Sequence, residues 1–362
     1  MCYFNYTVKH KQKWHNLAIF HPFPAKPGAE NGKKQVSKPL SQLLYHGFCK
    51  KQLKMRPLCD KVCPVMKMNK RLRGSLALLL ATVIWGSTFV AQSVGMDHVG
   101  PFTFQAARCL LAVIGLMPVI ALTDRKKQDQ KSFLARWADK KLWIAGILCG
   151  IPLSLACNLQ QFALVDTDAG KSAFLTAMYI VLVPVLGVFF KKKITFMVPV
   201  SVLLAVAGLY CLSCVGVTQI STGDLLLLGC ALMFAVQIVA VDRFAGQCDP
   251  LRLNAIQALV CAVLSGIMML FTETPSLPDI LSCWLPIGYA GFLSMGAAYS
   301  LQIIGQKDLE PSPAALIMSL ESVFAVVFGA LLLHETMTGW ELTGCALVFL
   351  AVILSQLPVK TK

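Results

Sequence analysis

Long apolar segments recur along most of the chain, and short polar connectors separate them. A helix that crosses a bilayer needs about 20 mostly apolar residues. Ten segments meet this requirement, with predicted bounds 74–92, 101–122, 142–162, 171–190, 195–214, 224–241, 253–271, 283–304, 312–333 and 338–357. Because the connectors are short, consecutive helices must run antiparallel. The pattern therefore predicts an all-α integral membrane protein with ten transmembrane helices.

The connectors predict the orientation of these helices, because Lys and Arg are retained on the cytoplasmic side of a membrane. If the N-terminus lies inside, the cytoplasmic connectors and the C-terminal tail hold 15 Lys and Arg residues, and the outer connectors hold only Lys171. The sequence therefore predicts a multi-pass protein of the cytoplasmic (plasma) membrane with both termini in the cytoplasm.

Composition supports the membrane interpretation and places most of the net charge outside the spans. Hydrophobic residues make up 56% of the chain and charged residues 14%, whereas soluble proteins carry about 25% charged residues. Residues 1–73 hold 16 Lys and Arg against two acidic residues, and the rest of the chain holds 17 against 16. The spans are close to neutral, so we expect no nucleic acid among the partners.

Residues 1–65 form a basic extension in which scattered Pro, Gly and Lys and the lack of a long apolar run predict disorder. A cytoplasmic extension without a separate function and a basic arm that binds RNA or anionic lipid are two alternatives. A third is that translation begins at Met66 or Met68, because MKMNKRLRG is typical of the start of a membrane protein.

The cysteines predict neither a disulfide framework nor a metal site. Ten of the 14 cysteines follow residue 73, nearly all in apolar segments, where cysteine behaves as a small hydrophobic residue. Cys59 and Cys63 lack partners at metal-ligand spacing. We therefore expect no cofactor and no metal.

A sequence repeat relates the two halves of the chain. Pro101 and Pro250 are 149 residues apart, and the same offset aligns RGSLALLLATVIW with TGDLLLLGCALMF. In the later spans the offset is 142, which aligns Asp168 with Glu310 and Gly187 with Gly329. The repeats are predicted at 66–214 and 215–362. Because each contains five spans, the second enters the membrane from the opposite side, which is the construction of many secondary transporters.

Four segments resemble a known family: LALLLATVIWGSTFVA, PFTFQAARCLLA, FLTAMYIVLVPVLGVFFKKKIT and SLESVFAVVFGALLLHETMTGWELTG. They are similar to the EamA branch of the drug/metabolite transporter (DMT) superfamily over residues 66–358. The resemblance implies a membrane carrier of small metabolites, commonly an exporter of amino acids, amines or related compounds. Ser322 stands where the family often has proline, so the resemblance does not carry a proline-induced helix break over to this span.

Two ionisable residues lie well within the spans, where each costs about 2.5–3.5 kcal/mol to insert. Glu321 lies roughly 14 Å into the ninth span at 1.5 Å per residue, near the midplane. It is either a proton or cation carrier, a counter-charge for an amine substrate, or a structural tie to a neighbouring helix. Arg108, roughly 10 Å into the second span, either binds a substrate carboxylate or makes a structural bond.

Uncharged polar residues form stripes on several spans, and amides and hydroxyls that faced lipid would lose their hydrogen bonds. We therefore expect these residues to face inward, where they line the substrate path or join helices. With the two charged residues, the predicted path residues are Trp85, Thr88, Gln92, Arg108, Asn158, Gln161, Thr176, Tyr179, Gln237, Tyr299, Gln302 and Glu321. Gly146 and Gly150 form a GxxxG pair that predicts close helix packing.

These features predict a secondary transporter rather than an enzyme. No P-loop pattern is present, so the expected driving force is a gradient of the substrate or of protons, with Glu321 as the candidate proton carrier. The expected mechanism is alternating access, in which a site for a small-molecule substrate opens first to one side of the lipid bilayer and then to the other. The expected active form is a monomer or a weak homodimer. The alternative is a membrane-embedded enzyme acting on a lipid or prenyl substrate; Asp166 and Asp168 come nearest to a carboxylate pair and are interpreted as caps.

Overall fold

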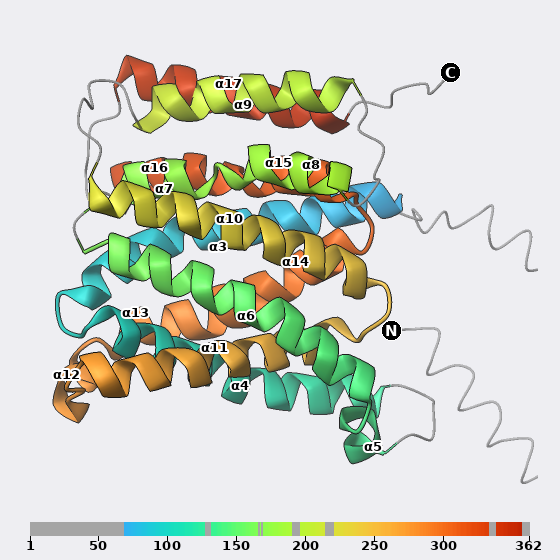
Figure 1. The fold of residues 1–362 in the computed structure, drawn as a ribbon, viewed down its shortest axis with the longest axis vertical. Helices are drawn as coiled ribbons and strands as arrows, with labels where there is room; N and C mark the ends of the chain where they lie inside the picture. Colours follow the sequence, from blue (N-terminus) through green and yellow to red (C-terminus); the bar gives the residue numbers. More distant parts are fainter. Residues whose placement is uncertain are drawn as a thin grey trace, which may run out of the picture. The chain divides into compact units, whose positions relative to one another are not determined.

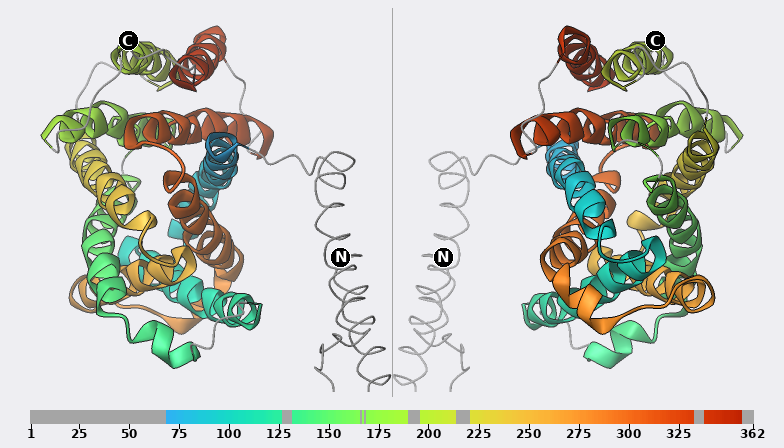
Figure 2. Two further views of the ribbon diagram at one scale, coloured as in Figure 1. Left: turned by 90° about the vertical axis from the view of Figure 1, so that its right-hand side faces the viewer. Right: turned by 90° about the vertical axis from the view of Figure 1, so that its left-hand side faces the viewer.

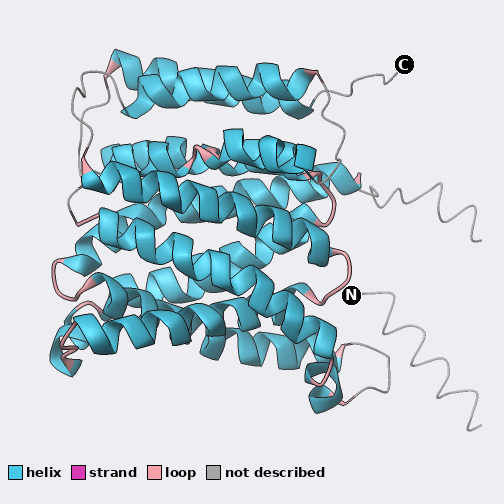
Figure 3. Ribbon diagram, in the orientation of Figure 1, coloured by secondary structure: helices cyan, strands magenta, loops and turns pink. Residues whose placement is uncertain are grey.

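The computed structural model describes residues 69–126, 132–165, 167, 169–189, 196–213, 221–332 and 338–356. Every regular element among them is a helix (Figure 3). The predictions for residues 1–65, for the start at Met66 or Met68 and for caps at Asp166 and Asp168 fall outside the described residues.

The first half of the described chain contributes five spans (Figure 1). Two of its features were not predicted: a short helix before the third span, and a fourth span built from two helices. The elements are α3 (Lys70–Met96), α4 (Pro101–Arg125), α5 (Phe133–Trp137), α6 (Lys140–Ala163), α7 (Ala169–Thr176), α8 (Tyr179–Phe189) and α9 (Met197–Ser213).

The second half contributes the other five spans. Its eighth span is continuous but contains a π-helical turn, and its ninth is again built from two helices. The elements are α10 (Thr222–Ala245), α11 (Pro250–Thr272), α12 (Leu277–Ser282), α13 (Trp284–Tyr289), η1 (Ala290–Ala298), α14 (Tyr299–Gln306), α15 (Pro311–Met318), α16 (Leu320–Leu332) and α17 (Gly339–Gln356).

Within the described residues, nine helical segments are long and apolar enough to cross a membrane, and α9 supplies a shorter apolar helix. The prediction of an all-α membrane protein with about ten spans is therefore confirmed. Local sequence explains where several helices begin. Pro101 and Pro250 occupy first-turn positions that need no backbone donor, and Ser221 and Asp224 form a capping box at the start of α10.

The fourth and ninth spans are interrupted at matching positions. The chain turns at Ala177 and Met178 between α7 and α8, and at Ser319 between α15 and α16. Ala177 and Ser319 are 142 residues apart, the offset predicted for the later spans. The break at Ser319 forms without a proline at position 322. The Ser322 hydroxyl instead donates to the carbonyl of Ala173 in α7, at 2.9 Å.

Glycines allow the closest helix crossings. A Cβ atom built on Gly150 would lie 2.8 Å from the Val260 side chain, so the GxxxG pair of α6 packs against α11 and that prediction is confirmed. In Figure 2, α9 and α17 lie side by side at one edge of the bundle. Gly208 and Gly344 face each other there, and a Cβ on Gly208 would lie 2.9 Å from the Gly344 carbonyl oxygen.

Candidate functional site

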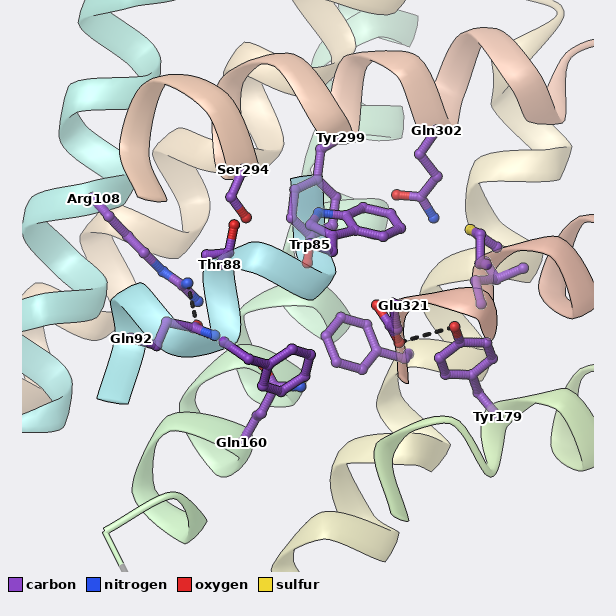
Figure 4. Close-up of a pocket in the computed structure, with 14 residues that line it drawn as sticks. Trp85, Thr88, Gln92, Arg108, Gln160, Tyr179, Ser294, Tyr299, Gln302 and Glu321 are labelled. Atoms are coloured by element: carbon purple, nitrogen blue, oxygen red, sulfur yellow. Dashed lines mark hydrogen bonds between the residues drawn. The ribbon is translucent and has the colours of Figure 1, made fainter. Parts of the chain in front are cut away.

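A cavity of about 40 Å³ lies where helices of both halves meet (Figure 4). The first half lines it from α3, α4, α6 and α8, and the second half from α10, the eighth span, α15 and α16. Its wall consists of Trp85, Thr88, Phe89, Gln92, Arg108, Gln160, Tyr179, Phe234, Ile238, Ser294, Tyr299, Gln302, Met318 and Glu321.

Arg108 places a cation at one side of the cavity. It is 4% exposed, its Nε donates to Gln105 Oε1 at 2.6 Å, and its Nη1 donates to Gln92 Oε1. The guanidinium also lies 5.8 Å from the centroid of the Phe104 ring. Its hydrogen-bond partners are neutral amides, so they orient the guanidinium without cancelling its charge.

Glu321 places a carboxyl group at the other side. It belongs to the first turn of α16, directly after the break at Ser319, where the helix N-terminus stabilises negative charge. The hydroxyl of Tyr179, the first residue of α8, donates to Glu321 Oε1 at 3.0 Å. Tyr179 and Glu321 are themselves 142 residues apart, so the contact joins equivalent positions of the two predicted repeats.

Arg108 and Glu321 are not joined by a hydrogen bond or ion pair in the described structure. Figure 4 shows them on different sides of the wall, with Trp85 and Thr88 between them. The Trp85 and Tyr299 rings contact each other there, with centroids 5.0 Å apart. The cavity therefore has a cationic side, a side with a carboxyl group and an aromatic stretch between them.

Part of the polar wall is left without partners. Trp85 Nε1 and Gln302 Oε1 are buried and make no hydrogen bond with the described residues. Because an unpaired buried polar atom is costly, these two atoms are positions where water or a polar substrate group would bind favourably.

Comparison with known proteins decides the family. The model of the EamA-like transporter family matches residues 72–214 and again residues 221–357. This chain belongs to the EamA-like transporter family. The resemblance found in the sequence is confirmed, and the chain is a multi-pass membrane transporter.

Several relatives of this EamA-like transporter are known. An uncharacterized transporter of Archaeoglobus fulgidus is 32% identical over 298 residues, which cover 80% of this chain and 88% of the relative. The uncharacterized transporter YoaV of Bacillus subtilis is 22% identical and covers 77% of this chain. The threonine/homoserine exporter RhtA of Escherichia coli is 30% identical over 167 residues, 44% of this chain and 54% of RhtA.

A solved crystal structure has the same fold. It matches with a TM-score of 0.65 and 18% identity, and it covers 78% of this chain and 96% of the solved chain. At that identity the match shows the fold alone.

The structure divides the predicted path residues of the transporter into two groups. Eight line the cavity: Trp85, Thr88, Gln92, Arg108, Tyr179, Tyr299, Gln302 and Glu321. Four lie outside its wall. Of these, Thr176 accepts from Gln160 at 3.2 Å, and Gln237 accepts from Gln302 at 3.0 Å, so both orient a lining amide.

Asn158 and Gln161 also lie outside the wall of the EamA-family cavity. Asn158 Oδ1 accepts from the Ser265 hydroxyl at 2.9 Å and so links α6 to α11. Gln161 is fully buried. The prediction that the polar stripes face the interior is confirmed. Only some of the residues in these stripes line the cavity.

Six lining residues were not predicted: Phe89, Gln160, Phe234, Ile238, Ser294 and Met318. The repeat offsets contain a signal for three of them, because each is the counterpart of a predicted path residue. Gln160 is the 142-residue counterpart of Gln302, Met318 is the 142-residue counterpart of Thr176, and Phe234 is the 149-residue counterpart of Trp85. Applying the offsets to each predicted path residue would have found these three.

Proposed function

We propose that this EamA-family protein exports a small zwitterionic metabolite, an amino acid or a close relative, by alternating access. One observation carries the proposal: a buried cation and a buried carboxyl group, one from each half of the chain, border the same central cavity. An α-amino acid carries the complementary pair of charged groups, because its ammonium and its carboxylate are both bonded to Cα.

Arg108 is the proposed carboxylate site. A guanidinium presents its donors in a planar fork that matches a carboxylate, and such charge-assisted bonds are about twice as strong as neutral ones. Its contacts to Gln92 and Gln105 hold the group in place while its charge stays uncompensated.

Glu321 is the proposed site for the ammonium group and for the coupling proton. With Tyr179 it offers a carboxylate oxygen and a hydroxyl oxygen as acceptors. A proton and an ammonium would compete for the same carboxyl group. Loading Glu321 with a proton after substrate release would therefore couple export to a proton gradient.

The cavity of about 40 Å³ is far smaller than the roughly 300–1,000 Å³ of ligand pockets. It corresponds to a closed state that must widen to admit substrate. The interrupted spans α7–α8 and α15–α16 supply two places where the wall can bend, and each carries one member of the Tyr179–Glu321 pair. Inverted repeats support this proposal, because exchanging their conformations turns an outward-facing state into an inward-facing one.

The direction, the orientation and the assembly belong to the same proposal. The partial relative RhtA is a threonine/homoserine exporter, which supports export of an amino acid. The asymmetric distribution of Lys and Arg supports cytoplasmic termini. A single chain contains both proposed halves of the transport unit, so we expect a monomer to be active, with at most a weak homodimer.

The test is efflux from proteoliposomes that contain the full chain. Three labelled compounds are compared: threonine, the amine that lacks its carboxylate and the hydroxy acid that lacks its ammonium. We expect saturable efflux of threonine, with kcat/KM at least tenfold lower for each truncated compound. Equal efflux of all three would exclude recognition of a zwitterion, and saturable efflux of the amine alone would assign the site to amines.

A further inference from the structure

A second cavity lies between α4, α5, α6 and α11, outside the central site. Its volume is about 290 Å³. One wall of it comes from the short helix α5, which Figure 1 shows beside the ends of α4 and α6. Aromatic and aliphatic side chains line it: Val113, Met117, Phe133, Trp137, Trp143, Ala255, Ile256 and Leu259.

The wall formed by α5 is held in place by polar contacts behind it. Arg252 is 2% exposed, and its guanidinium lies 5.4 Å from the Trp137 ring and 5.8 Å from the Phe133 ring. Its Nη2 forms an ion pair with Asp124 at the end of α4. Trp143 Nε1 donates to the Trp137 carbonyl at 2.7 Å. These contacts connect α5 with α11 and α6.

The cavity has an apolar interior and a polar edge. Trp137 Nε1 is buried and has no hydrogen-bond partner among the described residues. Four exposed cations flank α5, on the ends of α4 and α6 nearest to it: Arg125, Lys126, Lys140 and Lys141. Phe133 and Trp143 are each 39% exposed, so the lining is accessible from the surface of the bundle.

We propose that this cavity binds an acyl chain of an anionic phospholipid. A space with this lining holds water poorly, and an acyl chain of the surrounding bilayer would fill it with apolar groups. The four cations would bind the phosphate and the anionic headgroup, as basic pockets between transmembrane helices do. Trp137 Nε1 would donate to an ester or phosphate oxygen. This site is independent of the substrate proposed for the central cavity.

Quenching of tryptophan fluorescence by brominated acyl chains tests the proposal on the full chain. The reporter protein keeps Trp137 and Trp143, and its other four tryptophans are replaced by phenylalanine. It is reconstituted with brominated phosphatidylglycerol or brominated phosphatidylcholine in a background of the unbrominated neutral lipid. We expect half-maximal quenching at a mole fraction at least fivefold lower for the anionic lipid.

A second reporter keeps only Trp340, which is 59% exposed on α17 and should show no lipid preference. In the first reporter, replacing Arg125, Lys126, Lys140 and Lys141 by Gln should abolish the preference. Replacing Arg243 and Lys307, exposed cations elsewhere, should leave it unchanged. Equal quenching by both lipids at Trp137 and Trp143, or a preference that survives the quadruple substitution, would overturn the proposal.

Discussion

At the residue scale, the two halves have diverged at the positions that carry charge. Tyr179 and Glu321 are 142 residues apart, and one donates a hydrogen bond to the other. Arg108 has Gln257 as its 149-residue counterpart, so its charge also has no equivalent in the other half. If the halves exchange conformations during transport, the cavity keeps one side with the guanidinium and one side with the carboxyl group. The substrate would then be held by the same groups in both states.

Replacing Arg108 by Lys tests the carboxylate site. The change keeps a positive charge but removes the planar fork, and losing a charge-assisted hydrogen bond costs about 1.5–3 kcal/mol. We therefore expect kcat/KM for threonine efflux to fall roughly 10- to 100-fold, mainly through KM. Leu110→Ala, at a position 51% exposed on the same helix, should leave efflux unchanged. Normal KM in the Arg108→Lys protein would assign Arg108 a structural role.

Replacing Glu321 by Gln tests proton coupling. The amide oxygen can still accept the hydrogen bond from Tyr179, but the side chain can no longer exchange a proton. We expect efflux driven by a pH gradient to be lost. Glu310→Gln, which removes an exposed carboxylate at the start of α15, is the control and should keep the response. Uphill transport by Glu321→Gln with its usual dependence on the pH gradient would refute the coupling role.

At the element scale, interrupted helices and glycine crossings set the geometry of the cavity. The breaks in the fourth and ninth spans place Tyr179 and Glu321 at the starts of α8 and α16. Gly86 brings α3, which carries Trp85 and Thr88, against the backbone of α16. The close approach of α3 and α16 therefore depends on the lack of a side chain at Gly86.

Gly86→Ala should separate α3 from α16. The added Cβ would lie 2.8 Å from the backbone nitrogen of Ala325, which cannot move without shifting α16. Overpacking of this kind costs about 1–3 kcal/mol, so we expect a lower Tm in detergent and slower efflux. The matched control is Gly266→Ala in α11, where no atom of the described residues lies within 4 Å of the new Cβ. Equal Tm values for the two variants would show that α3 and α16 accommodate the added methyl group without loss of stability.

At the scale of the whole molecule, the central cavity lies where the two halves of the chain meet, and helices of both halves line it. The family model matches the chain twice, over 72–214 and 221–357. The contact between Cys157 and Tyr299, with Sγ and the hydroxyl oxygen 3.6 Å apart, is a second pair at the 142-residue offset. Such pairs are expected near the axis that relates two inverted repeats.

The orientation of the whole molecule is open to a labelling test. In a background without cysteines, Lys126→Cys lies after α4 and Thr274→Cys lies between α11 and α12. If the termini are cytoplasmic, a membrane-impermeant maleimide added to intact cells should label position 274 and leave position 126 unlabelled until the cells are opened. The reverse pattern would show that the molecule is inverted.

The sequence by itself determined the class, the ten spans and the inward direction of the polar stripes. The reason is the bilayer, which fixes the length of each apolar segment and penalises polar groups that face lipid. Both requirements apply to each helix separately, so each span and its inward face can be predicted from the sequence of that segment alone. The same reasoning selected eight residues that line the cavity, among them Arg108 and Glu321.

Only the tertiary structure decided which polar residues share the cavity. Thr176 and Gln237 face inward like their neighbours, but a lining amide covers each of them. Glu321 accepts a hydrogen bond from Tyr179, whereas Arg108 donates a hydrogen bond to Gln92. These choices depend on where helices far apart in sequence cross, which close contacts such as that at Gly86 determine. The hydrophobic pattern of one helix determines which of its faces is buried. The packing of all the helices determines which residues that face contacts.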